Sequence, residues 1–158
     1  LPWGVLLLFG GGLAIAAGFK ETGLASWIGN QLTVLDGIHF IFILIATTGL
    51  VLFLTEITSN TATATMILPA LGALALALGV HPFALMVPAA MAATCAFMLP
   101  VGTPPNAIIF ATGKIKIIEM VKTGFWINIF AWILIVVATY FLLPLIWNID
   151  LTVFPSNL

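Results

Sequence analysis

Long apolar runs separated by short polar stretches dominate this sequence. The chain has 158 residues, 63% of them hydrophobic, and carries only four Lys and five Asp or Glu. In an average soluble domain about 25% of the residues are charged. We therefore exclude an ordinary soluble enzyme and, because no basic stripe is present, a nucleic-acid-binding protein.

The chain is better counted in membrane crossings. Since a crossing needs about 20 apolar residues, there is room for about five or six apolar segments. The first run, residues 3–19, has small residues at every fourth position, Gly10, Ala14 and Gly18, a pattern typical of close helix packing in membranes. Residues 20–35 alternate apolar and polar side chains at helical spacing, which predicts an amphipathic helix in the membrane interface. The chain begins with Leu1 and no basic n-region precedes the first run, so we expect a piece of a longer protein rather than a signal peptide.

A polar cluster separates the next two apolar runs. Residues 55–65 contain five Thr and a single charge, Glu56, and they lack Gly and Pro. Two interpretations are open: two full membrane helices that meet in a surface loop, or a re-entrant hairpin that turns inside the membrane at Ser59, Asn60 and Thr61. Because a solvated loop usually carries Gly, Pro or several charges, we favour a re-entrant hairpin over residues 38–80.

A second interruption lies at residues 100–106, which read Pro-Val-Gly-Thr-Pro-Pro-Asn. Three prolines and a glycine cannot continue a helix. The sequence therefore predicts one broken crossing over residues 82–113, with Pro82 as the first helical residue. The carbonyls of Pro100 and Val101 would lose their helical donors, and in hydrocarbon they must find other partners or line a cavity.

The only basic cluster follows, with three Lys against one Glu between residues 114 and 122. This excess of Lys predicts a loop on the cytoplasmic side. A last membrane helix is expected over residues 123–147. Trp126 and Trp147 bracket it, as aromatic side chains do at the two membrane interfaces.

The two interruptions are the candidate functional sites. Secondary transporters hold substrates and coupling ions at discontinuous helices. Asn and Thr side chains donate hydrogen bonds to a carboxylate, and helix N-termini expected at Ala62 and Asn106 would add their positive ends. Carbonyl and hydroxyl oxygens suit a small hard cation. The pattern indicates an anion and a cation bound side by side without a fixed Arg or Lys, and the alternative is that these polar residues only pack helices.

Other residue types give weaker signals. Glu56 is an acid inside an apolar stretch, so it is either a proton carrier or field-setting group at the cation site, or a buried carboxyl hydrogen-bonded within the hairpin. His39 and His81 fall at predicted membrane edges. An intramembrane enzyme that uses Ser59 lacks a base, because no His or Lys lies in a plausible partner position. The single Cys excludes a disulfide within the chain and a Cys-built metal site. A non-transporting membrane fragment that serves assembly is a further alternative.

Three stretches carry a resemblance to a known family: LPWGVLLLFGGGLAIAAGFKETGL, TEITSNTATATMILP and GTPPNAIIFATGKI. Together they resemble the C-terminal repeat of the divalent anion:sodium symporter family, the bacterial dicarboxylate transporters. The resemblance implies an all-α membrane protein with a re-entrant helical hairpin and one broken helix, forming one half of an inverted-repeat transporter. It also implies a homodimer that moves as an elevator. Residues 1–37 would belong to the scaffold, as a transmembrane helix plus the interfacial helix, and residues 38–158 to the transport part.

The resemblance also implies the site residues. Ser59, Asn60, Thr61 and Thr103 would contact the substrate carboxylate, and Thr55, Thr58, Asn60 and Gly102 would surround one sodium ion, Thr58 and Gly102 through backbone oxygens. The other half of the site would come from the N-terminal repeat of the same protein, which this chain does not contain.

The implied function is sodium-coupled symport of C4-dicarboxylates (succinate, malate, fumarate) by a multi-pass protein of the plasma membrane, the bacterial inner membrane. A transporter of another anion (citrate, sulfate) or a proton-coupled ion transporter of related architecture is the alternative. The expected partners are the dicarboxylate, sodium, the lipid bilayer, the N-terminal repeat and a second copy of the chain.

Overall fold

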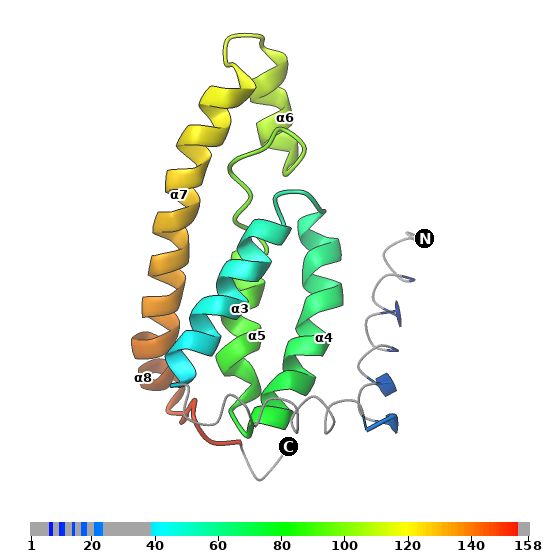
Figure 1. Ribbon diagram of the computed structural model, residues 1–158, viewed down its shortest axis with the longest axis vertical. Coiled ribbons are helices and arrows are strands. Elements are labelled where there is room, and N and C mark those ends of the chain that lie inside the picture. Colours follow the sequence, from blue (N-terminus) through cyan, green and yellow to red (C-terminus); the bar gives the residue numbers. More distant parts are fainter. Residues whose placement is uncertain are drawn as a thin grey trace.

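The computed structural model describes residues 39–154, together with residues 7, 10, 11, 14, 17, 18 and 21–23. The part of the chain that it describes is helical and contains no β-strand, as predicted. The elements follow in the order α3 (Phe40–Leu54), α4 (Asn60–Leu78), α5 (Pro82–Ala92), α6 (Pro104–Ala111), α7 (Ile117–Val137), the π-helix η2 (Ala138–Leu142) and α8 (Leu143–Trp147) (Figure 1).

Helices α3 and α4 form an antiparallel hairpin, and α5 packs against both of them (Figure 1). α7 runs along the outside of this group and contacts α3 and α5. Aliphatic side chains from all four helices build the core: Val51, Leu52, Leu71, Ala75, Leu85, Ala89, Ala92, Ala93 and Ile135. The many alanines let the helix backbones approach closely, which membrane helices require because lipid gives no hydrophobic drive to associate.

Local sequence sets the helix ends away from the hairpin turn. His39 caps α3 by accepting a hydrogen bond from the Ile41 N–H at its Nδ1 atom, and His81 caps α5 by accepting from the Phe83 N–H at 3.1 Å. Pro82 is the first residue of α5, as predicted. α4 ends at Gly79, whose φ of 67° is the left-handed conformation that glycine adopts most readily.

The last long helix begins earlier than predicted. α7 starts at Ile117 instead of residue 123, so residues 117–122 of the expected basic loop are helical. The reason is local: the Glu119 carboxylate accepts a hydrogen bond from the Lys116 N–H at 2.9 Å and closes the first turn. The helix then continues without a break to Trp147. The π-helical turn at residues 138–142 lies just before Pro144, which has no N–H to donate to the preceding turn.

Within the part of the chain that the structure describes, two helices are long and apolar enough to cross a membrane, namely α4 and the continuous helix Ile117–Trp147. Large apolar side chains on the latter face outward: Trp126, Phe130, Phe141 and Leu145 are each at least 68% exposed. Such a surface needs lipid or further protein to cover it. Helices α3 and α5 are apolar but shorter. Whether the α3–α4 hairpin is re-entrant, and whether the chain is one of two inverted repeats, stay predictions.

Few residues of the predicted scaffold part are described. Leu7, Gly10, Gly11, Ala14, Ala17 and Gly18 of the first apolar run are helical. A Cβ placed on Gly10 or Gly18 would meet no atom within 4 Å. The close packing predicted for this face therefore has no partner among the described residues. The amphipathic helix predicted at residues 20–35 lies outside them except for residues 21–23, and the division at residue 37 stays a prediction.

Candidate functional site

The turn between α3 and α4 is built around Thr55. Its side chain is fully buried, and its Oγ1 atom lies 2.8 Å from the Asn60 Oδ1 atom and 2.8 Å from the Ala93 carbonyl oxygen. A hydroxyl carries one proton, so it can donate to only one of these acceptors. Rotating the Asn60 amide by half a turn satisfies both contacts, because Nδ2 then donates to Thr55 and Oδ1 faces away from it. The buried Thr55 hydroxyl thus joins the hairpin turn to the end of α5.

The tip of the hairpin presents unengaged polar groups. α4 begins at Asn60, two residues before the predicted start at Ala62, and Ser59 is its N-cap residue. The Ser59 hydroxyl makes no capping hydrogen bond. Ser59 and Thr61 are exposed and Asn60 is half-buried. Two hydroxyls, one amide and a helix N-terminus therefore lie together at one point, a combination that suits an anion.

Thr58 has a different role in the turn. Its hydroxyl donates to the Leu54 carbonyl at 2.8 Å and also contacts the Thr63 hydroxyl. The side chain is therefore engaged within the hairpin, and the backbone carbonyl is the Thr58 group left for a ligand.

The break in the second crossing is longer than predicted. α5 ends at Ala92, so the chain leaves the helix at Ala93 rather than at Pro100. α6 begins at Pro104, two residues before the predicted start at Asn106, and the Thr103 hydroxyl caps it by accepting from the Asn106 N–H at 3.4 Å. The predicted interruption of the helix is confirmed, but its first seven residues include a single polar side chain, Thr94, and no Pro or Gly that would indicate a break.

Asn106 satisfies the backbone of this unwound segment. Its Nδ2 group donates to the carbonyls of Ala96 at 2.8 Å and Leu99 at 3.1 Å. The Leu99 carbonyl also accepts from the Gly102 N–H at 3.1 Å. The sequence pointed to the carbonyls of Pro100 and Val101 as those that need partners, whereas the structure gives partners to carbonyls closer to the N-terminus. The side chain of Asn106, predicted only as a helix start, holds the break in shape.

Replacing Asn106 by Ala removes the Nδ2 group, so the carbonyls of Ala96 and Leu99 each lose a hydrogen bond. We expect a loss of about 1–3 kcal/mol of stability, the usual cost of an unsatisfied buried polar group. The measurement is the thermal unfolding of the purified full-length protein that contains this chain. Thr94→Ala is the control, because the exposed Thr94 hydroxyl bonds only to the Met91 carbonyl within its own turn. Equal stability of the two variants would contradict this role of Asn106.

Glu56 connects the two interruptions. The residue is 3% exposed. Its carboxylate accepts hydrogen bonds from three consecutive backbone N–H groups, Phe97 at 2.8 Å, Met98 at 3.0 Å and Leu99 at 3.2 Å. It also accepts one from Asn128 Nδ2 on α7. The carboxyl is buried and hydrogen-bonded, as one of the two interpretations expected, although its partners lie in the broken crossing and on α7 instead of the hairpin. A field-setting role at a cation site stays a prediction.

Two glycines let these segments approach one another. A Cβ placed on Gly102 would lie 3.0 Å from the Ala96 Cβ atom and 3.6 Å from a Glu56 carboxylate oxygen. A Cβ on Gly124 of α7 would overlap the Phe97 carbonyl oxygen and lie 2.6 Å from the Met98 Cα atom. Gly102 thus lies beside the buried carboxylate, and α7 touches the unwound backbone directly.

The structure brings together part of the predicted site. Thr55 and Asn60 are hydrogen-bonded, and Gly102 lies beside Glu56, the residue after Thr55. Among the described residues no hydrogen bond joins Ser59 or Thr61 to Thr103. Asn128 was not predicted, because one Asn in a long apolar helix has no partner that can be read from the sequence.

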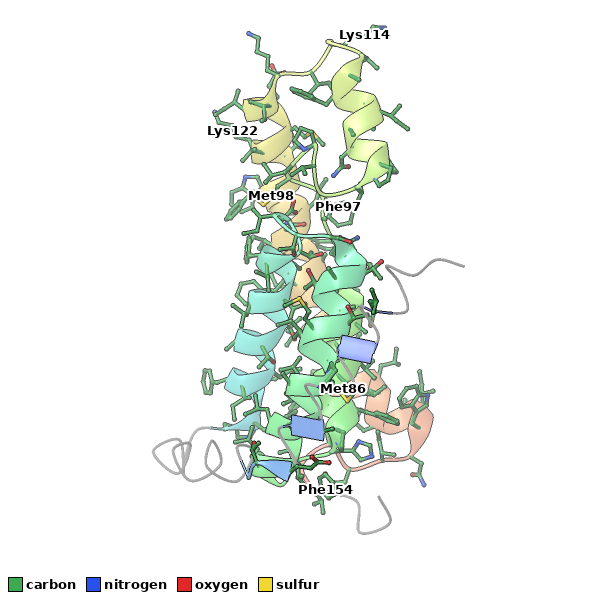
Figure 2. All side chains as sticks on the ribbon, turned by 90° about the vertical axis from the view of Figure 1, so that its right-hand side faces the viewer. Met86, Phe97, Met98, Lys114, Lys122 and Phe154 are labelled. Carbon is green, nitrogen blue, oxygen red and sulfur yellow. The ribbon has the colours of Figure 1, made fainter. Side chains whose placement is uncertain are left out.

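The described lysines lie away from the hairpin turn. Lys114 and Lys122 are at the end of the molecule where α6 meets α7, whereas Phe97 and Met98 lie nearer its middle (Figure 2). His39 and His81 are bound to backbone N–H groups at the starts of α3 and α5. A 15-residue α3 is about 22 Å long at 1.5 Å per residue, so His39 is remote from Ser59. Neither His serves as a base for Ser59.

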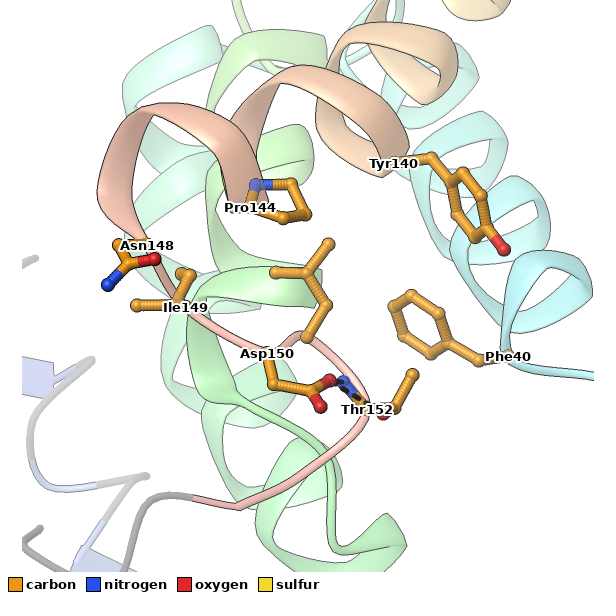
Figure 3. Close-up of a pocket in the computed structure, with 8 residues that line it drawn as sticks. Phe40, Tyr140, Pro144, Asn148, Ile149, Asp150 and Thr152 are labelled. Atoms are coloured by element: carbon orange, nitrogen blue, oxygen red, sulfur yellow. Dashed lines mark hydrogen bonds between the residues drawn. The ribbon is translucent and has the colours of Figure 1, made fainter.

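A surface pocket lies at the end of the bundle away from the hairpin turn. The pocket, of about 580 Å³, is lined by Phe40, Tyr140, Pro144 and residues 148–152 (Figure 3). Its one carboxylate, Asp150, accepts hydrogen bonds from the Thr152 hydroxyl and from the Thr152 N–H at 2.8 Å, and these bonds lower the pKa of Asp150. A carboxylate with a lowered pKa repels an anion, so this pocket is a poor candidate for an anion site.

An apolar helical chain whose two interruptions meet around hydroxyl, amide and backbone groups has the kind of arrangement found in secondary transporters. Comparison with known proteins agrees with this class. Residues 1–148 match the family described as "Sodium:sulfate symporter transmembrane region", and the chain belongs to this family. The resemblance to sodium symporters of divalent anions is thereby confirmed.

Individual relatives are similar over almost the whole chain. It is 61% identical over 152 residues to the sodium-dependent dicarboxylate transporter SdcS of Staphylococcus saprophyticus. It is 61% identical over 151 residues to the proteins of the same name from Staphylococcus aureus strains MRSA252 and USA300. Each comparison covers 96% of this chain but 29% of the relative, so the chain spans less than a third of the relatives' length.

Proposed function

We propose that this chain is the C-terminal part of a sodium-coupled symporter of C4-dicarboxylates such as succinate, malate and fumarate. One observation carries the proposal: the two helix interruptions are hydrogen-bonded to each other, through Thr55 to Ala93 and through Glu56 to residues 97–99. Two polar breaks held together in apolar helices form the kind of site that secondary transporters use. The names of the relatives, sodium-dependent dicarboxylate transporters, support the choice of ion and substrate.

The anion would bind at the hairpin tip and the start of α6. Ser59, Asn60 and Thr61 offer hydroxyl and amide donors at the N-terminus of α4, and Thr103 lies at the N-terminus of α6. Helix N-termini favour negative charge. In this proposal these neutral donors replace the Arg or Lys that a soluble dicarboxylate site would use.

Sodium would bind next to the anion. Its ligands would be oxygens of Thr55, Thr58, Asn60 and Gly102. The Asn60 amide lies 2.8 Å from the Thr55 hydroxyl. With the amide rotated by half a turn, Nδ2 would donate to Thr55, and Oδ1, a good ligand for a hard cation, would face away from it. Gly102 lies beside the Glu56 carboxylate, whose negative charge favours a cation nearby.

The larger architecture is also part of the proposal. The α3–α4 turn lies partway along α7 rather than level with its end (Figure 1), which supports a re-entrant hairpin. Residues 38–158 would form the moving transport part and residues 1–37 the scaffold, in a plasma-membrane homodimer whose other repeat completes the site. The exposed apolar faces of α7 and α8 leave room for such partners.

The test is uptake by the full-length transporter reconstituted in liposomes. We expect radiolabelled succinate to accumulate under an inward sodium gradient and not under an equal potassium gradient. Uptake driven equally by a proton gradient, or no uptake at all, would contradict sodium coupling. Because the family description names sulfate, unlabelled sulfate and citrate are added as competitors. Competition by sulfate would show that the site also accepts sulfate, and accumulation of labelled sulfate but not of labelled succinate would replace the dicarboxylate by sulfate as the substrate.

A further inference from the structure

A buried polar contact ties α7 to the two interruptions. Asn128 is completely buried in the middle of α7, and its Nδ2 group donates to the Glu56 carboxylate. Its Oδ1 atom is buried without a hydrogen-bond partner among the described residues. Burying an amide oxygen without a partner is unfavourable, so a buried Asn in an apolar helix calls for an explanation. The one hydrogen bond that this side chain makes among the described residues goes to the carboxylate that binds the N–H groups of residues 97–99.

The surrounding geometry shows that this contact is specific. Gly124 lies one turn before Asn128 on α7, and residues four apart share a face of a helix. At Gly124 the helix touches the backbone of Phe97 and Met98 so closely that a Cβ would not fit. The same face of α7 thus meets the unwound segment through backbone packing at Gly124 and through a hydrogen bond at Asn128.

The Glu56 carboxylate is the centre of the arrangement. All of its hydrogen-bond partners among the described residues are N–H donors, three from consecutive backbone amides and one from Asn128. A buried carboxylate depends on such donors, because it has lost its water. Removing the Asn128 amide takes one hydrogen bond from the Glu56 Oε1 atom. The carboxylate can then shift or bind water. The backbone N–H groups of residues 97–99 would be held less firmly as a result.

The segment held in this way leads directly into the proposed site. Residues 97–99 precede Gly102 and Thr103 by three to six positions, and Glu56 itself follows Thr55 and precedes Thr58. A loosened carboxylate therefore changes the alignment of Gly102 and Thr103 with the hairpin turn. If only a fraction of the molecules has these residues correctly aligned, the apparent affinity for sodium and for the anion falls to that fraction of its full value.

We propose that Asn128 is a positioning residue. Through the Glu56 carboxylate it fixes the unwound backbone, and with it the alignment of Gly102 and Thr103 with the sodium and anion ligands of the hairpin turn. The inference rests on the proposed function for its effect on transport, but the contact itself can be tested without transport. Asn128 acts through Glu56 and touches neither ligand.

The first experiment is hydrogen exchange of the purified full-length transporter, read by mass spectrometry in peptides that cover residues 97–99. In Asn128→Ala we expect these amides to exchange at least about tenfold faster than in the wild type, because their acceptor is no longer fixed. Thr139→Val is the matched control: Thr139 is buried in the same continuous helix, and its hydroxyl has no hydrogen-bond partner among the described residues. Its exchange at residues 97–99 should be unchanged.

The second experiment is sodium-driven succinate uptake, normalised to the amount of folded protein. A site that is correctly arranged in about a tenth of the molecules has half-saturation concentrations about tenfold higher. We expect this rise for sodium and for succinate in Asn128→Ala, with a maximal rate within about threefold of the wild type. If that variant does not fold, Asn128→Ser, which keeps a shorter donor, is used with the same two measurements.

The outcomes separate the possibilities. Faster exchange together with raised half-saturation concentrations supports the positioning role. Unchanged exchange, or a lower amount of folded protein with unchanged half-saturation concentrations, overturns it. If the wild type takes up no dicarboxylate, the proposed function fails, and the exchange experiment alone then decides whether Asn128 fixes residues 97–99.

Discussion

Replacing Asn60 by Ala is expected to abolish sodium-driven succinate uptake by the full-length transporter. Asn60 is the one side chain assigned to both the anion and the sodium ion, and it lies at the first turn of α4, 2.8 Å from the Thr55 hydroxyl. A hydrogen bond to a charged group contributes about 1.5–3 kcal/mol. The loss of this hydrogen bond to the anion, together with the loss of one oxygen ligand of the sodium ion, is expected to lower uptake by at least about a hundredfold.

The measurement is the initial uptake rate, normalised to the amount of transporter in the liposomes. Asn148→Gly is the matched control: Asn148 is exposed at the end of α8 with a φ of 51°, a conformation that glycine adopts readily. This control should transport like the wild type. Uptake at the wild-type rate by Asn60→Ala, at normal expression, would remove the central residue of the proposed site.

Replacing Gly124 by Ala is expected to destabilise the protein more than a typical exchange of one small residue for another. The new Cβ would overlap the Phe97 carbonyl oxygen and lie 2.6 Å from the Met98 Cα atom. These are backbone atoms, so no side-chain rotation relieves the overlap and α7 must move away from the unwound segment. Overpacking costs about 1–3 kcal/mol when side chains can adjust. We expect about 3 kcal/mol or more here, seen as a melting temperature lower by about 10 °C.

Gly72→Ala provides the comparison for this experiment. A Cβ on Gly72 would lie 3.3 Å from the sulfur of Met86, a flexible side chain that can move aside. The melting temperature of that variant should stay within about 2–3 °C of the wild type. If Gly124→Ala and Gly72→Ala unfold at the same temperature, the close contact between α7 and residues 97–98 does not contribute to stability.

Much of the helix order could be predicted because proline and capping residues lie at the helix starts. Pro82 starts α5 as predicted, and Thr103 with Pro104 and Pro105 starts α6 two residues before the predicted point. The prediction for the last helix was wrong at its start. The three lysines indicated a loop, but a single carboxylate, Glu119, closes a helical turn among them. Charge composition places a segment relative to a membrane better than it defines a helix end.

The break in the second crossing shows where prediction from sequence fails. Residues 93–99 contain one polar side chain, Thr94, and lack Pro and Gly, so the local sequence does not indicate a helix end at Ala93. The backbone leaves the helix where its N–H groups find a stronger acceptor, the Glu56 carboxylate more than 40 residues earlier in the chain. Such a contact depends on which segments pack together, and the spacing of apolar and polar residues along the chain does not predict it.

The sequence by itself determined an apolar, all-helical membrane chain with two polar interruptions, because charge scarcity, helical spacing and proline are properties of neighbouring residues. Only the tertiary structure decided that Glu56 joins those interruptions, that Asn128 reaches it from α7, and that Gly102 and Gly124 leave room for both. A buried charge must find its hydrogen-bond donors in three dimensions, and these donors come from two segments that lie far from Glu56 and from each other in the chain.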